Sequence, residues 1–184
     1  MTDLDFMRRA LELADQAAGL TSPNPLVGAV VARDSVVVGE GFHAGPGRPH
    51  AEIEALRAAG GRARGATLYV TLEPCAHQGR TSPCAPALVA AGLARVVVAT
   101  GDPNPLVDGR GLEILRRAGI AVDSGLLADE ARAQNRAFFT WITHRRPHVT
   151  LKTAMTLDGQ SETCSPDSNH ERPRPATGWS ATGT

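Results

Sequence analysis

The sequence lacks a net charge, because 19 lysines and arginines are balanced by 19 aspartates and glutamates in 184 residues. It is also poor in aromatic side chains, with two tryptophans, one tyrosine and four phenylalanines. A neutral chain has no overall basic field, and few aromatics mean few platforms on which bases could stack. Binding to nucleic acid and editing of RNA or DNA are therefore disfavoured, and we expect a small-molecule partner.

Long hydrophobic runs are absent too. The amino-terminal segment MTDLDFMRRALELADQ mixes charges into an apolar pattern and has no signal-peptide core. No apolar stretch reaches the roughly 18 residues that a membrane span needs. We therefore expect a cytoplasmic protein with no membrane partner.

Cysteines are few and odd in number: Cys75, Cys84 and Cys164. With no export signal, this count favours metal ligation or free thiols over a disulfide framework. Cys164 lies in a polar segment and is interpreted as an incidental thiol.

Hydrophobic periodicity divides the chain into alternating helices and strands. Thr2 and Asp5 are expected to cap the first helix. The patterns predict helices over residues 3–18, 50–59, 84–91, 110–118 and about 127–140, and strands over residues 26–32, 35–42, 66–72, 95–100 and 120–123. This alternation indicates an α/β fold with helices on both faces of a sheet.

One catalytic domain is expected over residues 1–145, because the chain is short for two domains and a linker. Residues 146–160 resemble a linker followed by one more strand. Residues 161–184 are rich in Ser, Thr, Pro and Gly and cannot bury enough surface to offset the entropy of ordering, so we expect a disordered tail.

The chemistry is concentrated at two predicted helix starts. His50-Ala-Glu52 opens one helix, and Pro74-Cys75 with Cys84 precedes the next. Catalytic zinc typically takes three protein ligands and leaves one position to water, and one histidine with two cysteines meets that need. Glu52, beside the ligands, is placed to move protons for a water made acidic by the metal. Histidine with two thiolates favours zinc over harder cations.

Each part of this pattern has an ordinary alternative. A histidine at a helix start is commonly a capping residue, and two cysteines nine positions apart are commonly buried thiols. Their order and spacing together match the zinc deaminase signature H-x-E…P-C-x-x-C, except that eight residues instead of two separate the cysteines. We expect this inserted polar loop, residues 76–83, to recognise the substrate.

Longer motifs extend this match. They are PNPLVGAVV (23–31), HAE (50–52), YVTLEPCAH (69–77), GRTSPC (79–84), DPNPLV (102–107) and GRG (109–111). On these motifs, residues 3 to about 160 resemble the deaminase domain of the bifunctional riboflavin biosynthesis deaminase-reductases, in the cytidine deaminase-like superfamily. The resemblance implies a three-layer α/β/α sandwich around a mixed sheet of about five strands. It also implies one zinc ion per chain.

The resemblance further implies a substrate and its contacts. The substrate would be 2,5-diamino-6-(5-phosphoribosylamino)pyrimidin-4-one, whose 2-amino group is hydrolysed to give 5-amino-6-(5-phosphoribosylamino)uracil and ammonia. Glu52 would shuttle the protons. Residues that would contact the pyrimidine or the ribose phosphate are Asn24, His43, His77, Arg80, Thr81, Asp102 and Asn104.

Two of these residues also have a local explanation, since Asp102 and Asn104 are typical turn formers in a DPNP loop. The Gly109-Arg-Gly111 segment lacks the spacing of a nucleotide-binding fingerprint and is interpreted as a helix start. The basic cluster of His144, Arg145, Arg146 and His148 is interpreted as a solvated linker.

In the resembled family, the segment like residues 149–159 begins an NADPH-binding reductase domain. Nothing from Ser161 onward matches that domain, so we expect no reductase activity. The sequence leaves open whether the chain is a stand-alone deaminase or a truncated product. Two other functions also remain open: deamination of another base or nucleotide (cytosine, guanine or deoxycytidylate), and a catalytically silent, zinc-stabilised assembly module. The oligomeric state is open as well, and the apolar face of helix 127–140, with Phe138, Phe139 and Trp141, is a candidate contact surface for a homo-oligomer.

Overall fold

The computed structural model describes residues 1–76, 82–104, 107 and 109–153. The chain divides into two units, residues 1–148 and residues 149–184. In the second unit, residues 149–153 are described; they are exposed and contain no strand. The strand expected after the linker within residues 146–160 therefore lies mostly outside the described residues, as does the expected tail.

In the described residues of the first unit, the strands form a five-stranded sheet in the order β2-β1-β3-β4-β5. Strand β1 pairs antiparallel with both β2 and β3, whereas β3, β4 and β5 are parallel. The sheet is therefore mixed, as expected. The strands span Gly28–Arg33 (β1), Val36–Phe42 (β2), Thr67–Leu72 (β3), Arg95–Thr100 (β4) and Ala121–Ser124 (β5).

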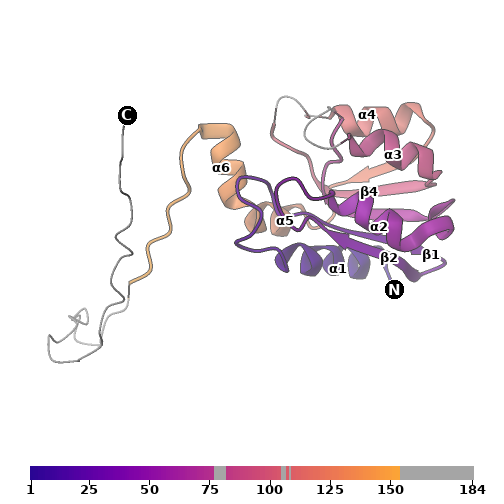
Figure 1. The fold of residues 1–184 in the computed structure, drawn as a ribbon, viewed down its shortest axis with the longest axis horizontal. Helices are drawn as coiled ribbons and strands as arrows, with labels where there is room; N and C mark the ends of the chain where they lie inside the picture. The colour runs from indigo at the N-terminus through magenta and orange to yellow at the C-terminus, as the bar shows by residue number, and fades with distance from the viewer. Residues whose placement is uncertain (77–81, 105–106, 108, 154–184) are drawn as a thin grey trace, which may run out of the picture. The chain divides into compact units, whose positions relative to one another are not determined.

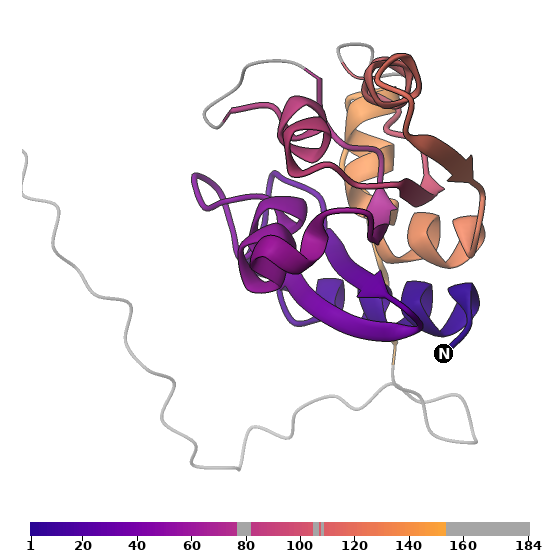
Figure 2. The same cartoon turned by 90° about the vertical axis from the view of Figure 1, so that its right-hand side faces the viewer.

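Helices cover both faces of this sheet (Figures 1 and 2). They are α1 (Asp3–Asp15), α2 (Ala51–Ala59), α3 (Cys84–Ala91), α4 (Arg110–Arg117), α5 (Ala128–Gln134) and α6 (Arg136–His144), with a short 3-10 turn at Gly60–Ala63. One apolar core lies under α2, α3 and α4, and a second lies under α1 and α5. The three-layer α/β/α sandwich is confirmed.

Helix α1 begins as its sequence predicts. The Thr2 hydroxyl accepts from the Asp5 backbone N–H, and the Asp5 carboxylate accepts from the Thr2 N–H, which forms a capping box. Its apolar stripe, including Phe6 and Met7, is buried against the sheet. The helix ends at Asp15 and not at residue 18, as the periodicity had indicated.

Helix α2 packs on β2 by direct backbone contact. A Cβ atom at Gly39 would lie 2.3 Å from the Ala55 carbonyl oxygen, and one at Gly41 would lie 2.6 Å from that of Ala51. Only glycine fits at such distances, so the sequence of β2 brings this helix closer to the sheet than side chains would allow.

The helix expected over residues 127–140 is instead two helices, α5 and α6. They meet at Asn135, whose φ of −99° and ψ of 19° leave the helical range. Its buried amide binds the backbone of Leu26, accepting from the N–H at 2.7 Å and donating to the carbonyl at 2.8 Å. A contact distant in sequence therefore divides the helix.

Among the described residues, none of the helices is both long enough and apolar enough to span a membrane.

Candidate active site

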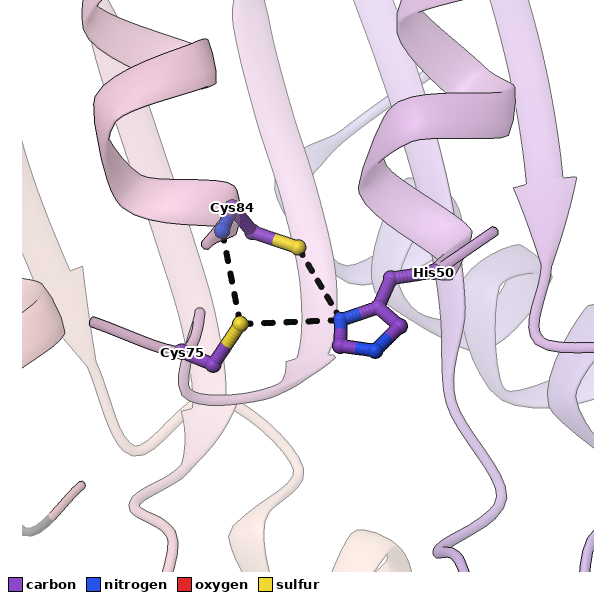
Figure 3. Close-up of side chains that lie close together, drawn as sticks. All are labelled: His50, Cys75 and Cys84. Carbon is purple, nitrogen blue, oxygen red and sulfur yellow. Dashed lines mark hydrogen bonds between the residues drawn. The ribbon is translucent and has the colours of Figure 1, made fainter. Parts of the chain in front are cut away.

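Two of the three predicted ligands stand at helix starts, and the third lies on a loop (Figure 3). His50 is the residue that precedes α2, with extended backbone, and Cys84 is the first residue of α3. Cys75 follows β3, at the carboxyl end of the parallel strands. In α/β sheets this edge is the usual position of a ligand site.

Their donor atoms form a compact cluster. The Nδ1 atom of His50 lies 3.1 Å from Cys84 Sγ and 3.6 Å from Cys75 Sγ, and the Cys84 backbone N–H donates to Cys75 Sγ at 3.3 Å. All three ligand atoms lie within 4.8 Å of one another, so the group could hold a metal ion. Tetrahedral zinc with ordinary bond lengths needs about 3.6 Å between nitrogen and sulfur ligands. The distance from His50 Nδ1 to Cys75 Sγ has this value, and the distance to Cys84 Sγ is shorter, at 3.1 Å. The donor set therefore fits zinc in its chemistry, and zinc would require only a small separation of the His50–Cys84 pair.

The two thiols differ in acidity. The interaction with the Cys84 thiol, aided by His50, lowers the pKa of Cys75 to about 4. The same pairing, with burial, raises the pKa of Cys84. The lowered pKa favours the thiolate form of Cys75, which is the form that ligates metals.

Glu52 lies in the first turn of α2 and is 3% exposed. Burial raises the pKa of this carboxyl group, because a low-dielectric surrounding disfavours its charged form. A carboxyl with a raised pKa is suited to accept and return a proton near neutral pH.

A cavity of about 520 Å³ opens beside these residues. Most of the predicted site residues that the structure describes line this cavity, and its other walls are mostly apolar. The predicted residues that line it are Asn24, His43, His50, Glu52, Cys75, Asp102 and Asn104. A cavity of this size accommodates a small organic molecule.

Two of the predicted substrate residues form a hydrogen-bonded chain. His43 Nδ1 lies 3.1 Å from the Pro49 carbonyl oxygen, which can only accept, so Nδ1 carries the proton. Burial lowers the pKa of His43, and the neutral ring then accepts at Nε2 from the Asn24 amide nitrogen, 2.9 Å away. This orientation leaves the Asn24 carbonyl oxygen as the acceptor that its side chain can offer to a ligand.

The loop after β4 combines its two expected roles. Asp102 Oδ1 accepts from the Asn104 backbone N–H at 2.9 Å, which is the contact of a turn former. Both residues also line the cavity. His77, Arg80 and Thr81 lie outside the described residues.

The structure adds cavity residues that the sequence did not indicate. Phe138, Trp141 and Ile142 of α6 line the cavity, together with Arg48 of the loop before α2. The two aromatics, Phe138 and Trp141, belong to the face that the sequence suggests for assembly, and Trp141 is 44% exposed. Predicting α6 as part of a longer helix concealed its position at the site.

The fold and the His-Cys-Cys cluster with its buried glutamate define the class of zinc-dependent deaminases. A family model, described as the cytidine and deoxycytidylate deaminase zinc-binding region, matches residues 1–100. This chain belongs to that family.

Within this family, the chain is similar to RibD proteins of riboflavin biosynthesis. The chain is 56% identical over 161 residues to the riboflavin biosynthesis protein RibD of Aquifex aeolicus, a match that covers 88% of this chain and 45% of the relative. Among solved structures, Acinetobacter baumannii RibD (form 1) has a TM-score of 0.84 at 50% identity, covering 93% of this chain and 48% of that one. The Thermotoga maritima diaminohydroxyphosphoribosylaminopyrimidine deaminase/5-amino-6-(5-phosphoribosylamino)uracil reductase has a TM-score of 0.81 at 46% identity, covering 85% and 45%. The chain spans about half the length of the curated relatives it matches.

Proposed function

We propose that this chain catalyses the hydrolytic deamination of 2,5-diamino-6-(5-phosphoribosylamino)pyrimidin-4-one in riboflavin biosynthesis. The products would be 5-amino-6-(5-phosphoribosylamino)uracil and ammonia. The observation that carries the proposal is the cavity in which the His50-Cys75-Cys84 cluster and the buried Glu52 meet the polar groups of Asn24 and Asp102. The similarity to RibD proteins at about half identity supports the choice of substrate.

In this proposal His50, Cys75 and Cys84 hold one zinc ion. Bound zinc supplies an acidified water at neutral pH. Glu52 accepts a proton from the attacking water as the C–O bond forms at the ring carbon that carries the 2-amino group. It gives this proton to the adjacent ring nitrogen. It then carries the second water proton from the new hydroxyl group to the departing nitrogen as the C–N bond breaks, so that ammonia leaves and a carbonyl remains.

The pocket residues orient the ring for this exchange. The Asn24 carbonyl oxygen, which the hydrogen bond to His43 leaves as the acceptor of this side chain, is suited to a ring N–H donor. We also assign contacts with the ring to Asp102 and Asn104. In the inter-cysteine loop we assign contacts with the substrate to His77, Arg80 and Thr81, where the Arg80 guanidinium and the Thr81 hydroxyl would bind the ribose phosphate. The α6 aromatics would form an apolar wall for the heterocycle.

The test is ammonia release from this ribotide by the zinc-loaded protein, with cytosine, guanine and deoxycytidylate as competitors. If another of these compounds is deaminated in preference, that compound and not the ribotide is the substrate. If none of them is deaminated, the catalytically silent, zinc-stabilised module is favoured.

Glu52→Ala separates catalysis from metal binding. General acid–base groups contribute roughly 10²- to 10⁴-fold to rate, so we expect turnover to fall by that factor while zinc stays at one ion per chain. Glu54→Ala, two positions along the same helix, is the matched control and should keep both properties. Loss of zinc from Glu52→Ala would show that Glu52 is a ligand and not the base.

The proposal concerns deamination alone. Cytoplasmic location, the lack of a nucleic-acid partner and assembly into a homo-oligomer remain predictions from the sequence.

A further inference from the structure

Glu73 is a buried carboxylate that the proposed reaction does not use. It follows β3, stands two positions before Cys75 and is 5% exposed. Its backbone N–H donates to the Thr100 carbonyl at the end of β4, at 3.0 Å. Glu73 therefore joins the metal-binding segment to the strand that leads into the Asp102 loop.

Both oxygens of the side chain bind the start of α4. Oε2 accepts from the Gly109 backbone N–H at 3.0 Å, and Oε1 accepts from the Gly111 N–H at 3.1 Å. Two N–H groups that a helix start leaves without intrahelical partners are thereby satisfied by one carboxylate, whose charge also complements the helix dipole.

The first turn of α4 presses on the residue before the ligand. A Cβ atom at Gly111 would lie 1.9 Å from the Pro74 carbonyl oxygen, so the two backbones are in direct contact. On its other side, Cys75 is fixed to α3, because the Ala85 N–H donates to the Cys75 carbonyl at 3.1 Å. The Pro74-Cys75 segment is thus held between α3 and α4, and the Glu73 carboxylate is the polar contact on the α4 side.

We propose that Glu73 is a positioning residue, whose carboxylate holds the start of α4 against Pro74-Cys75 and thereby fixes the Cys75 thiolate for metal binding. This inference rests on the metal site assigned under the proposed function. Replacing a group that orients a metal ligand, but does not itself bind the metal, typically lowers metal affinity by about 10- to 100-fold.

Glu73→Gln is the direct test, because it preserves shape but places an amide N–H₂ opposite one of two backbone N–H donors. We expect zinc affinity, measured by chelator competition, to fall about 10- to 100-fold. The absorption spectrum of the cobalt-substituted protein should change, since it reports thiolate geometry. Glu113→Gln, on the exposed side of the same helix, is the matched control and should bind zinc as the unaltered protein does.

A fall in thermal stability with unchanged zinc affinity and cobalt spectrum would overturn the proposal, since Glu73 would then only stabilise the fold. If Glu73→Gln fails to fold, hydrogen exchange on the unaltered protein still decides. The Gly109 and Gly111 amides should be protected, and more so with zinc bound; exchange at the rate of an open loop, or protection that zinc leaves unchanged, would overturn it.

These measurements do not require turnover. An unaltered protein that binds zinc but releases no ammonia would refute the proposed reaction and leave the positioning role standing. An unaltered protein that binds no zinc would refute both the metal site and this inference.

Discussion

We expect Asn135, the residue between α5 and α6, to stabilise the fold more than any exposed polar residue of these two helices. Its amide forms two hydrogen bonds with the Leu26 backbone, across 109 positions of sequence. Asn135→Ala removes both partners at once and leaves the Leu26 N–H and carbonyl to whatever water can reach them.

The size of the effect follows from these two bonds. A neutral hydrogen bond contributes about 0.5–1.5 kcal/mol, and a buried group left without a partner costs about 1–3 kcal/mol. Leu26 is only half-buried, so water recovers part of this cost. We expect Asn135→Ala to lower the free energy of unfolding by about 2–3 kcal/mol, which corresponds to roughly 4–12 °C in Tm for a domain of this size.

Thermal unfolding followed by circular dichroism measures this change. Asn135→Asp sharpens the test, because it keeps the acceptor for the Leu26 N–H but puts a carboxylate oxygen opposite the Leu26 carbonyl; its loss should be at least as large. Arg132→Ala, which removes an exposed ion pair with Asp129, should change stability by less than about 1 kcal/mol. A Tm for Asn135→Ala within 2 °C of the unaltered protein (roughly 1 kcal/mol or less) would refute the reasoning.

Three further predictions follow from the packing, charge and metal site. Gly41→Ala should lower the free energy of unfolding by about 1–3 kcal/mol and weaken zinc binding, because α2 must move to make room for the new Cβ. Gly61→Ala has open space around its Cβ and should change neither stability nor zinc binding. Denaturant titration measures the stability, and chelator competition measures the zinc affinity. Hydrogen bonds from Arg95 and then Tyr69 lower the pKa of Asp3, so the stability they add is present above about pH 4 and lost as pH falls through the lowered folded value. Asp3 is about half exposed, so Asp3→Asn should cost only about 1 kcal/mol at pH 7, and urea titrations should show this difference shrinking towards pH 2. Removing zinc with a chelator should lower Tm and restoring it should reverse the change; equal Tm values with and without zinc would argue against a site that forms with the fold.

Local sequence signals were sufficient for most elements and for the metal cluster. The run Arg95–Thr100 is rich in β-branched residues, and its bounds as a strand match the prediction. His50, Cys75 and Cys84 could be grouped from sequence because their order and spacing are typical of a known zinc chemistry, and the structure brings them together. The contacts assigned to the other site residues remain predictions.

Tertiary contacts explain what the sequence did not reveal. The segments on both sides of Asn135 are helix-compatible, and only the distant Leu26 backbone explains the break. A glutamate after a strand, such as Glu73, has no local signature, because its partners are 36 and 38 positions away. Phe138 and Trp141 have the pattern of any amphipathic helix, and their place at the cavity depends on how α6 packs.

The contact between α2 and the glycines of β2 has a consequence for how this protein can change. Most helices rest on side chains, which adopt new rotamers and absorb small shifts. Here Gly39 and Gly41 place the helix that carries His50 and Glu52 directly on backbone, with no adjustable layer between. We therefore expect directed evolution for new substrates to tolerate changes in the cavity walls and to reject nearly every change along this short length of strand.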